Sequence, residues 1–146
     1  MTVIAWDGKI LAADMQITSN TTVSITTKIK LVETRSCDKY LIGVTGSIGD
    51  LQAFCHWFTS ENDSEKYPKN FIDDSAAAIV INEAGEINLY ETTPFGTLLQ
   101  TKTFAIGSGK QFAMAAMYYG KSAIEGVHLA CQFDAYCGQG IDTLKF

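Results

Sequence analysis

Asp14 is the residue whose position first indicates chemistry in this sequence. It ends the apolar run Ala12-Ala13-Asp14, where burying an unpaired carboxylate would cost several kcal/mol of free energy, about 2–7 even for a neutral polar group. A cation is therefore expected beside it, and Lys28 and Lys30 on the next strand-like segment are the available candidates. For a lone aspartate a cap, a turn or a solvated charge is the more common role, so the apolar context is what singles out Asp14.

A glycine-rich run, "AIGSGKQ" at residues 105–111, resembles the end of a phosphate-binding loop. It fails as a Walker A motif, because Phe104 stands five positions before Gly109 and Gln111 follows Lys110 where Ser or Thr is needed. A tight turn from a strand into a helix explains the glycines better. Ser108 is then a helix N-cap or a hydroxyl that supports a nearby site.

Length and composition bound the class of protein. A chain of 146 residues with 47% hydrophobic and 18% charged residues is predicted to form one globular domain over residues 1–146. The net charge of −5 and the lack of a Lys/Arg cluster argue against nucleic acid as a partner. No apolar run reaches the roughly 20 residues of a membrane helix. With no secretion signal recognisable at its start, the protein is expected to be cytoplasmic.

Metal and disulfide chemistry are not expected. The four cysteines, Cys37, Cys55, Cys131 and Cys137, form no CxxC pair, and the chain has two histidines. Zinc sites and disulfide frameworks require denser patterns. The prediction is free thiols, no metal and no cofactor.

The elements that must position Asp14 and its lysine are strands. Two apolar runs at 2–6 and 9–13 flank Asp7-Gly8, which predicts a hairpin with a two-residue type I′ turn. Residues 21–32 are β-branched and alternating, and they predict one strand or a bent pair of strands. Residues 40–45 predict a further strand that runs into the turn "GSIGD".

The rest of the chain groups helices between strands, which predicts a layered arrangement rather than alternating βαβ units. Asp50 is an acceptable N-cap for an amphipathic helix that ends near residue 60, and residues 60–70 are linker-like. The remaining predicted elements are a hairpin of strands 76–82 and 86–91, a strand at 101–107, two helices divided near Gly120, and a closing strand at 140–146.

Five pieces of sequence in this order resemble one family. They are Thr2 followed by a hairpin into "AADMQIT", then "TKIKLV", "IGVTGSIGD", "FAIGSG" and "DAYCGQGID". Each is a weak signal alone, and the order makes them specific. The sequence resembles the N-terminal-nucleophile (Ntn) hydrolases of the proteasome β-subunit and HslV type. The resemblance implies an α+β fold, a four-layer αββα sandwich with two antiparallel sheets between layers of helices.

The resemblance also implies the catalytic residues. Thr2 would be the nucleophile once Met1 is removed, and Asp14 would orient the lysine beside the Thr2 hydroxyl. Lys28 in "TKI" is the first choice for that lysine. Lys30 is the alternative, because a one-residue bulge in the strand would exchange the two.

Supporting and substrate-binding positions follow from the same motifs. Gly46 matches the glycine whose backbone N–H forms the oxyanion hole. The residues expected to support the terminal amine and the Thr2 hydroxyl are Ser108, Asp134 and Cys137. The residues expected beside the substrate are Val44 and Thr45 at the P1 pocket and Thr18 for backbone pairing with a bound peptide.

The implied chemistry is physically sound. A free α-amino group has a pKa of about 7.7–8.0, so it can act as the general base within its own residue. A buried lysine lowers the proton affinity of the amine and the hydroxyl. An oxyanion-hole donor contributes about 2.7–4 kcal/mol to transition-state stabilisation.

The predicted function is threonine-type hydrolysis of peptides or unfolded proteins, by a homo-oligomeric ring with an ATPase unfoldase as a possible partner. Two alternatives stay open. Cys137, where the family usually has Ser, and the short segment between residues 60 and 76 fit a catalytically inactive assembly protein on the same fold. An Ntn amidohydrolase that acts on a small amide is the other alternative, because a fold does not determine the substrate.

Overall fold

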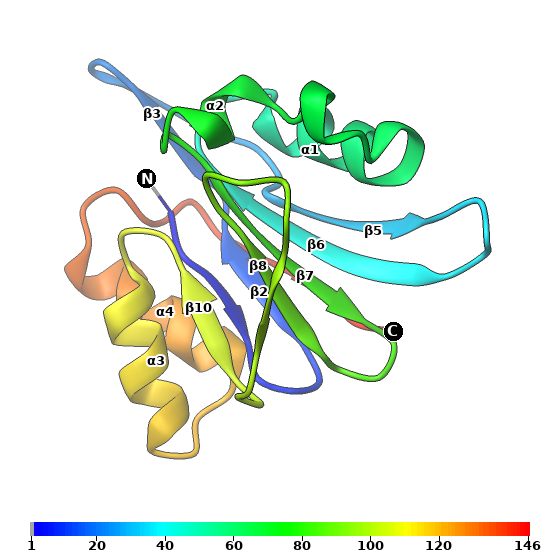
Figure 1. Ribbon diagram of the computed structural model, residues 1–146. Coiled ribbons are helices and arrows are strands. Elements are labelled where there is room, and N and C mark those ends of the chain that lie inside the picture. Colours follow the sequence, from blue (N-terminus) through cyan, green and yellow to red (C-terminus); the bar gives the residue numbers. More distant parts are fainter. Residues whose placement is uncertain (1) are drawn as a thin grey trace.

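A four-stranded antiparallel sheet contains the first strand of the chain at its centre. The computed structural model describes residues 2–146 (Figure 1). Its first sheet has the strand order β10-β1-β2-β11. The strands are β1 (Ile4–Trp6), β2 (Leu11–Asp14), β10 (Phe104–Ile106) and β11 (Ile141–Leu144). Because β1 lies between β10 and β2, Thr2 and Val3 are held by segments far apart in the sequence: the Gly109 N–H donates to the Thr2 carbonyl and the Asp14 N–H to the Val3 carbonyl.

Two further antiparallel sheets follow. A five-stranded sheet contains β5 (Ile29–Glu33), β6 (Lys39–Thr45), β7 (Ala77–Asn82), β8 (Ile87–Tyr90) and β9 (Thr97–Leu99) in sequence order. A two-stranded sheet pairs β3 (Gln16–Ser19) with β4 (Thr22–Ile25). The hairpin of β3 and β4 extends away from the body of the protein (Figure 1).

The α-helices come in two pairs along the chain. The first pair is α1 (Asp50–His56), which continues as a π-helical segment Trp57–Glu61, and the short α2 (Lys69–Ile72), with a 3-10 turn Ser64–Lys66 between them. The second pair is α3 (Lys110–Tyr118) and α4 (Ala123–Phe133). No helix within residues 2–146 is long and apolar enough to cross a membrane. The chain is therefore an α+β protein with several antiparallel sheets.

Three apolar clusters join these elements. One joins α1 and α2 to the five-stranded sheet around Phe54 and Phe71, and another joins α3 and α4 to β1 and β2 around Val3 and Val127. The third contains Ile4, Trp6 and Leu11 of the first sheet together with Ile79, Ile81 and Ile87 of the five-stranded sheet. The inner faces of the two sheets thus pack on each other, and burial of their Ile and Leu side chains stabilises the fold by about 1.5–3 kcal/mol each.

The predicted turn at Asp7-Gly8 was wrong in its detail. Trp6 pairs with Leu11, so the loop has four residues, from Asp7 to Ile10. Asp7 Oδ1 accepts hydrogen bonds from the N–H groups of Lys9 and Ile10 at 2.9 Å. Gly8 has φ +97° and Asp7 has no positive φ, which excludes a type I′ turn. The aspartate side chain closes the hairpin together with a backbone hydrogen bond from the Asp7 N–H to the Ile10 carbonyl at 3.3 Å.

Other predicted boundaries also changed. Residues 21–32 are a bent pair of strands, because β4 ends at Ile25 and β5 begins at Ile29 in a different sheet. Asp50 is not the N-cap of α1: Gly49 is, with φ +96°, and Asp50 is the first helical residue. The short strand β9 and the strand β3 were not predicted, since neither has a clear alternation of apolar residues.

Candidate active site

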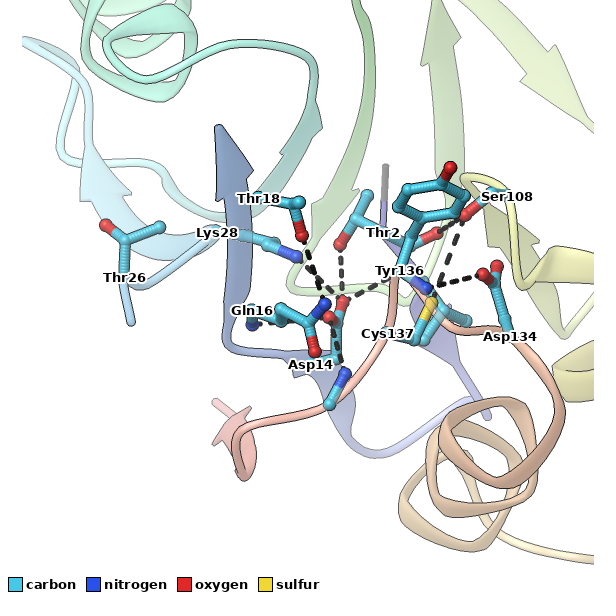
Figure 2. A network of polar contacts seen from close by, with 12 residues as sticks. Thr2, Asp14, Gln16, Thr18, Thr26, Lys28, Ser108, Asp134, Tyr136 and Cys137 are labelled. Carbon is cyan, nitrogen blue, oxygen red and sulfur yellow. Dashed lines mark hydrogen bonds and ion pairs between the residues drawn. The ribbon is translucent and has the colours of Figure 1, made fainter. Parts of the chain in front are cut away.

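Asp14 is the centre of a buried polar network (Figure 2). Its side chain is fully buried. Oδ1 accepts hydrogen bonds from Thr2 Oγ1 at 2.6 Å, Lys28 Nζ at 2.9 Å and the Val3 N–H at 3.0 Å. Oδ2 accepts from the N–H groups of Gly138 at 3.1 Å and Gln16 at 3.3 Å. A carboxylate with two oxygens can accept about four hydrogen bonds, so this one is saturated and fixed in place.

The lysine that pairs with Asp14 is Lys28. Its side chain is buried, whereas Lys30 is exposed and its Nζ lies 3.4 Å from Gln52 Oε1. The chain passes from the β3–β4 hairpin to the five-stranded sheet at residues 26–28, and the Val44 N–H donates to the Lys28 carbonyl at 3.0 Å. This crossing places the Lys28 side chain beside Asp14 of β2. The pairing of β5 with β6 is continuous from Ile29 to Glu33, so this strand has no bulge that would exchange Lys28 and Lys30.

Thr2 is held at its backbone as well as at its hydroxyl. Its carbonyl oxygen accepts a hydrogen bond from the Gly109 N–H at 3.1 Å and from Ser108 Oγ at 3.3 Å. Gly107 has φ +98°, and a Cβ there would clash with the Thr2 carbonyl. The turn Gly107-Ser108-Gly109 therefore receives the first strand, and α3 is capped by Gly109 rather than by the Ser108 hydroxyl.

The segment after α4 completes the site from the other end of the chain. Cys137 Sγ lies 4.0 Å from Ser108 Oγ, and Asp134 Oδ1 accepts from the Tyr136 N–H at 2.9 Å. Burial opposes the charge of Asp134, but hydrogen bonds from Ser108, Tyr136 and Cys137 outweigh it and lower its pKa. Burial raises the pKa of the Cys137 thiol to about 12, with smaller contributions from the Asp14 and Asp134 carboxylates. Cys137 is thus a neutral thiol at physiological pH.

A cleft of about 650 Å³ opens beside Thr2. Its walls come from β3, the crossing at residues 26–28, and the turn before α1, and its lining includes Thr2, Thr18, Lys28, Val44 and Gly46. Thr45 does not line it: the Thr45 hydroxyl donates to the Ala77 carbonyl at 3.3 Å and accepts from the Ala77 N–H at 3.2 Å. Of the three positions predicted to face substrate, the cleft therefore includes Thr18 and Val44.

Gly46 follows the end of β6 and has φ +136°, a conformation that favours glycine. Within residues 2–146 its N–H makes no hydrogen bond. Gly46 also lines the cleft that contains Thr2. A backbone N–H in this position can donate to an oxygen atom of a molecule bound over the Thr2 hydroxyl.

Gln16 belongs to the site and was not predicted. Its side chain is buried, and its Nε2 donates to Thr18 Oγ1 and to the Ala135 carbonyl, each at 3.1 Å. It thereby connects the strand along the cleft with the segment that contains Cys137 (Figure 2). One signal was available in the sequence: in extended backbone, side chains two residues apart point to the same side, so Gln16 is expected on the side of Asp14.

The network is built from hydrogen bonds and one ion pair. No group of three or more His, Cys, Asp or Glu side chains in residues 2–146 is arranged to bind a metal ion. The cysteines of the described chain are all free thiols. What the arrangement offers chemically is a hydroxyl, a lysine and a carboxylate in contact beside an open cleft.

The fold is similar to that of several solved structures. No protein-family model and no curated protein matches the chain. BPH from Thiobacillus denitrificans, solved in complex with epoxomicin, superposes with a TM-score of 0.74 at 18% identity, covering 100% of this chain and 98% of BPH. HslV from Trypanosoma brucei gives 0.61 at 20% identity, with 99% of each chain covered. This chain has the proteasome β-subunit and HslV type of Ntn-hydrolase fold.

A third relative extends the Ntn-fold comparison. The Gly-1 mutant of Anbu from Hyphomicrobium sp. strain MC1 gives a TM-score of 0.74 at 12% identity, covering 100% of this chain and 82% of Anbu. The resemblance stated from the five sequence motifs is thereby confirmed at the level of the fold. At identities of 12–20%, the roles of individual residues have to be argued from the site itself.

Proposed function

We propose that this protein is a threonine-type peptidase in which Thr2, freed by removal of Met1, is the nucleophile. One observation carries the proposal: the Thr2 hydroxyl and the Lys28 ammonium bind the same oxygen of the buried Asp14 carboxylate, at 2.6 and 2.9 Å. A hydroxyl fixed beside a buried cation is electrostatically favoured as a nucleophile, because the cation stabilises the alkoxide that develops.

The reaction then proceeds by acyl transfer. The free α-amino group of Thr2 takes the hydroxyl proton while Oγ1 attacks the peptide carbonyl carbon, and the carbonyl oxygen becomes an oxyanion that accepts from the Gly46 N–H. The protonated amine gives its proton to the leaving amine as the C–N bond breaks, which leaves an ester on Thr2. Water activated by the same amine hydrolyses the ester and regenerates the hydroxyl.

The substrate and the assembly are part of the same proposal. A cleft of about 650 Å³ open along β3 suits an extended peptide whose backbone runs beside Thr18. Residues 1–146 form one domain, a four-layer αββα sandwich, and a cytoplasmic homo-oligomeric ring encloses the sites. The ring receives unfolded chains from a partner ATPase.

The test combines mass, inhibition and mutation. Intact mass of the natively expressed protein is expected to show loss of Met1, and epoxomicin is expected to add covalently at Thr2. Thr2→Ala is expected to abolish peptide hydrolysis and labelling, while Thr2→Ser, which keeps a hydroxyl, is expected to retain measurable activity. Retention of Met1, or full turnover by Thr2→Ala, would refute the peptidase and favour an inactive assembly protein. Hydrolysis of small amides alone would favour the amidohydrolase.

A further inference from the structure

The turn that contains Gly46 is fixed by a buried carboxylate behind it. Asp50, the first residue of α1, is 6% exposed. Its Oδ2 accepts a hydrogen bond from the Ser47 N–H at 2.6 Å, and its Oδ1 accepts from Asn70 Nδ2 at 2.8 Å. The backbone N–H of Asp50 also donates to the Ser47 carbonyl at 3.2 Å. The side chain and the backbone of Asp50 therefore close this turn together.

The backbone of the turn is conformationally permissive by itself. Gly46 and Gly49 both have positive φ, +136° and +96°, so the segment has glycine's conformational freedom at two of its four positions. The side chain of Ile48, between them, is 77% exposed and does not anchor the turn in the core. Gly46 is packed against Asp50 so closely that a Cβ would clash with Oδ2 and lie 2.9 Å from Ala76 Cβ.

Asn70 connects this turn to a distant segment. It lies in α2, at the end of the stretch 60–70 that was predicted to be linker-like. Its neighbour Phe71 is fully buried in the apolar cluster that contains Phe54 of α1. The Asn70 carbonyl accepts from the Ser75 N–H at 2.8 Å. Asn70 is thus held on both sides, and its amide donates to Asp50 from a rigid position.

We propose that Asp50 and Asn70 are positioning residues that aim the Gly46 N–H at the oxyanion. Before Gly46, Thr45 is held in β6 by its pairing with Ala77 and by its hydroxyl, which bonds both backbone groups of Ala77. The peptide plane after Gly46 is fixed by the Ser47 N–H on Asp50. With both neighbours held, Gly46 stays at its φ of +136°, and its N–H, which makes no hydrogen bond within residues 2–146, keeps one orientation in the wall of the cleft. The proposal rests on the proposed peptidase function, since it assigns a task to Gly46 in that reaction.

Substitutions at the two positions test this directly. Asp50→Asn leaves one oxygen for two donors, so either the Ser47 N–H or the Asn70 amide loses its acceptor. Asn70→Asp sets two carboxylates against each other. The double variant Asp50→Asn/Asn70→Asp reverses donor and acceptor, and it restores a hydrogen bond between the side chains while an amide oxygen still accepts from Ser47. Asp73→Asn, an exposed change of the same charge near α2, is the matched control.

The expected result is a change in kcat that the swap reverses. Asp50→Asn and Asn70→Asp are each expected to lower kcat for a peptide substrate about tenfold to a hundredfold, with KM changed less than about threefold, since loss of an oxyanion donor costs about 10²–10³. The double variant is expected to recover kcat to within about threefold of the parent. Unchanged kcat in either single variant, or no recovery in the double variant, overturns the proposal.

A second readout separates this proposal from the peptidase proposal. The amide resonance of Gly46 in a ¹H–¹⁵N spectrum is expected to shift in both single variants, to return in the double variant and to stay in place in Asp73→Asn. This measurement needs no turnover, so it holds even if Thr2 proves inactive. If Asp50→Asn does not fold, Asn70→Ala, at a partly exposed side chain, takes its place and is expected to shift the same resonance. A Gly46 resonance that does not respond overturns the positioning role.

Discussion

Replacing Asp14 by asparagine is the perturbation that most directly tests the network around Thr2. An amide of the same shape keeps one acceptor oxygen and turns the other acceptor into a donor. In one orientation of the amide, its NH₂ group faces the N–H groups of Gly138 and Gln16. In the other orientation, it faces the three donors that now bind Oδ1. In either orientation the Lys28 ammonium loses its carboxylate while its side chain stays 9% exposed.

The magnitude follows from the burial of both partners. Removing one member of a buried ion pair costs about 3–5 kcal/mol, because a desolvated charge is left without compensation. For a domain whose total stability is about 5–15 kcal/mol, this is a large fraction. Asp14→Asn is therefore expected to lower the free energy of unfolding by about 3–5 kcal/mol. The corresponding fall in Tm is about 10 °C or more for a chain of this size.

Urea denaturation followed by circular dichroism measures the effect. Lys28→Met is expected to cost a similar amount, and the double variant less than the sum of the two by about 2 kcal/mol or more, because the orphaned charge is removed. Asp142→Asn is the matched control: its carboxylate accepts from the exposed Thr27 hydroxyl at 2.6 Å, and about 1 kcal/mol or less is expected. A loss below about 1 kcal/mol for Asp14→Asn, or strict additivity with Lys28→Met, would refute the reasoning.

Three smaller predictions concern α4 and the thiols. Ser122→Ala removes the N-cap of the capping box and is expected to lower the free energy of unfolding by about 1 kcal/mol in urea titrations. The hydrogen bond from the Ser122 N–H lowers the pKa of Glu125, so the ionised carboxylate stabilises the fold above its ordinary pKa of about 4.3. In urea titrations, the free energy of unfolding is therefore expected to be higher than that of Glu125→Gln near neutral pH, and this difference is expected to disappear as the pH falls through the lowered pKa. Iodoacetamide at pH 8 is expected to modify the exposed Cys37 well before the buried Cys137, because the pKa of about 12 keeps the Cys137 thiol protonated. Peptide mass spectrometry measures the two rates, and equal rates would contradict the burial of Cys137.

Much of the fold follows from local patterns in the sequence. The strands predicted at 40–45 and 76–82 are present as β6 and β7, because β-branched and apolar runs of that length are typical of buried strands. The two helices separated at Gly120 were predicted because apolar periodicity stops at the glycine. Details of turns were less predictable. Asp7 closes its loop with a side chain, and Gly49 rather than Asp50 caps α1, because the hydrogen-bond partner of a short polar side chain depends on the loop geometry around it.

The sequence by itself determined that Asp14 needs a cation, because a carboxylate at the end of an apolar strand must be paired if it is buried. It also supplied Thr2, Gly46 and the glycine turn at residues 107–109 in an order that predicts the Ntn-hydrolase fold. Only the tertiary structure decided between Lys28 and Lys30, because the choice depends on where the chain crosses from one sheet to another. It alone placed Gln16, Asp50 and Asn70, since each makes a hydrogen bond to another element of the fold, and such contacts exist only once the chain has folded.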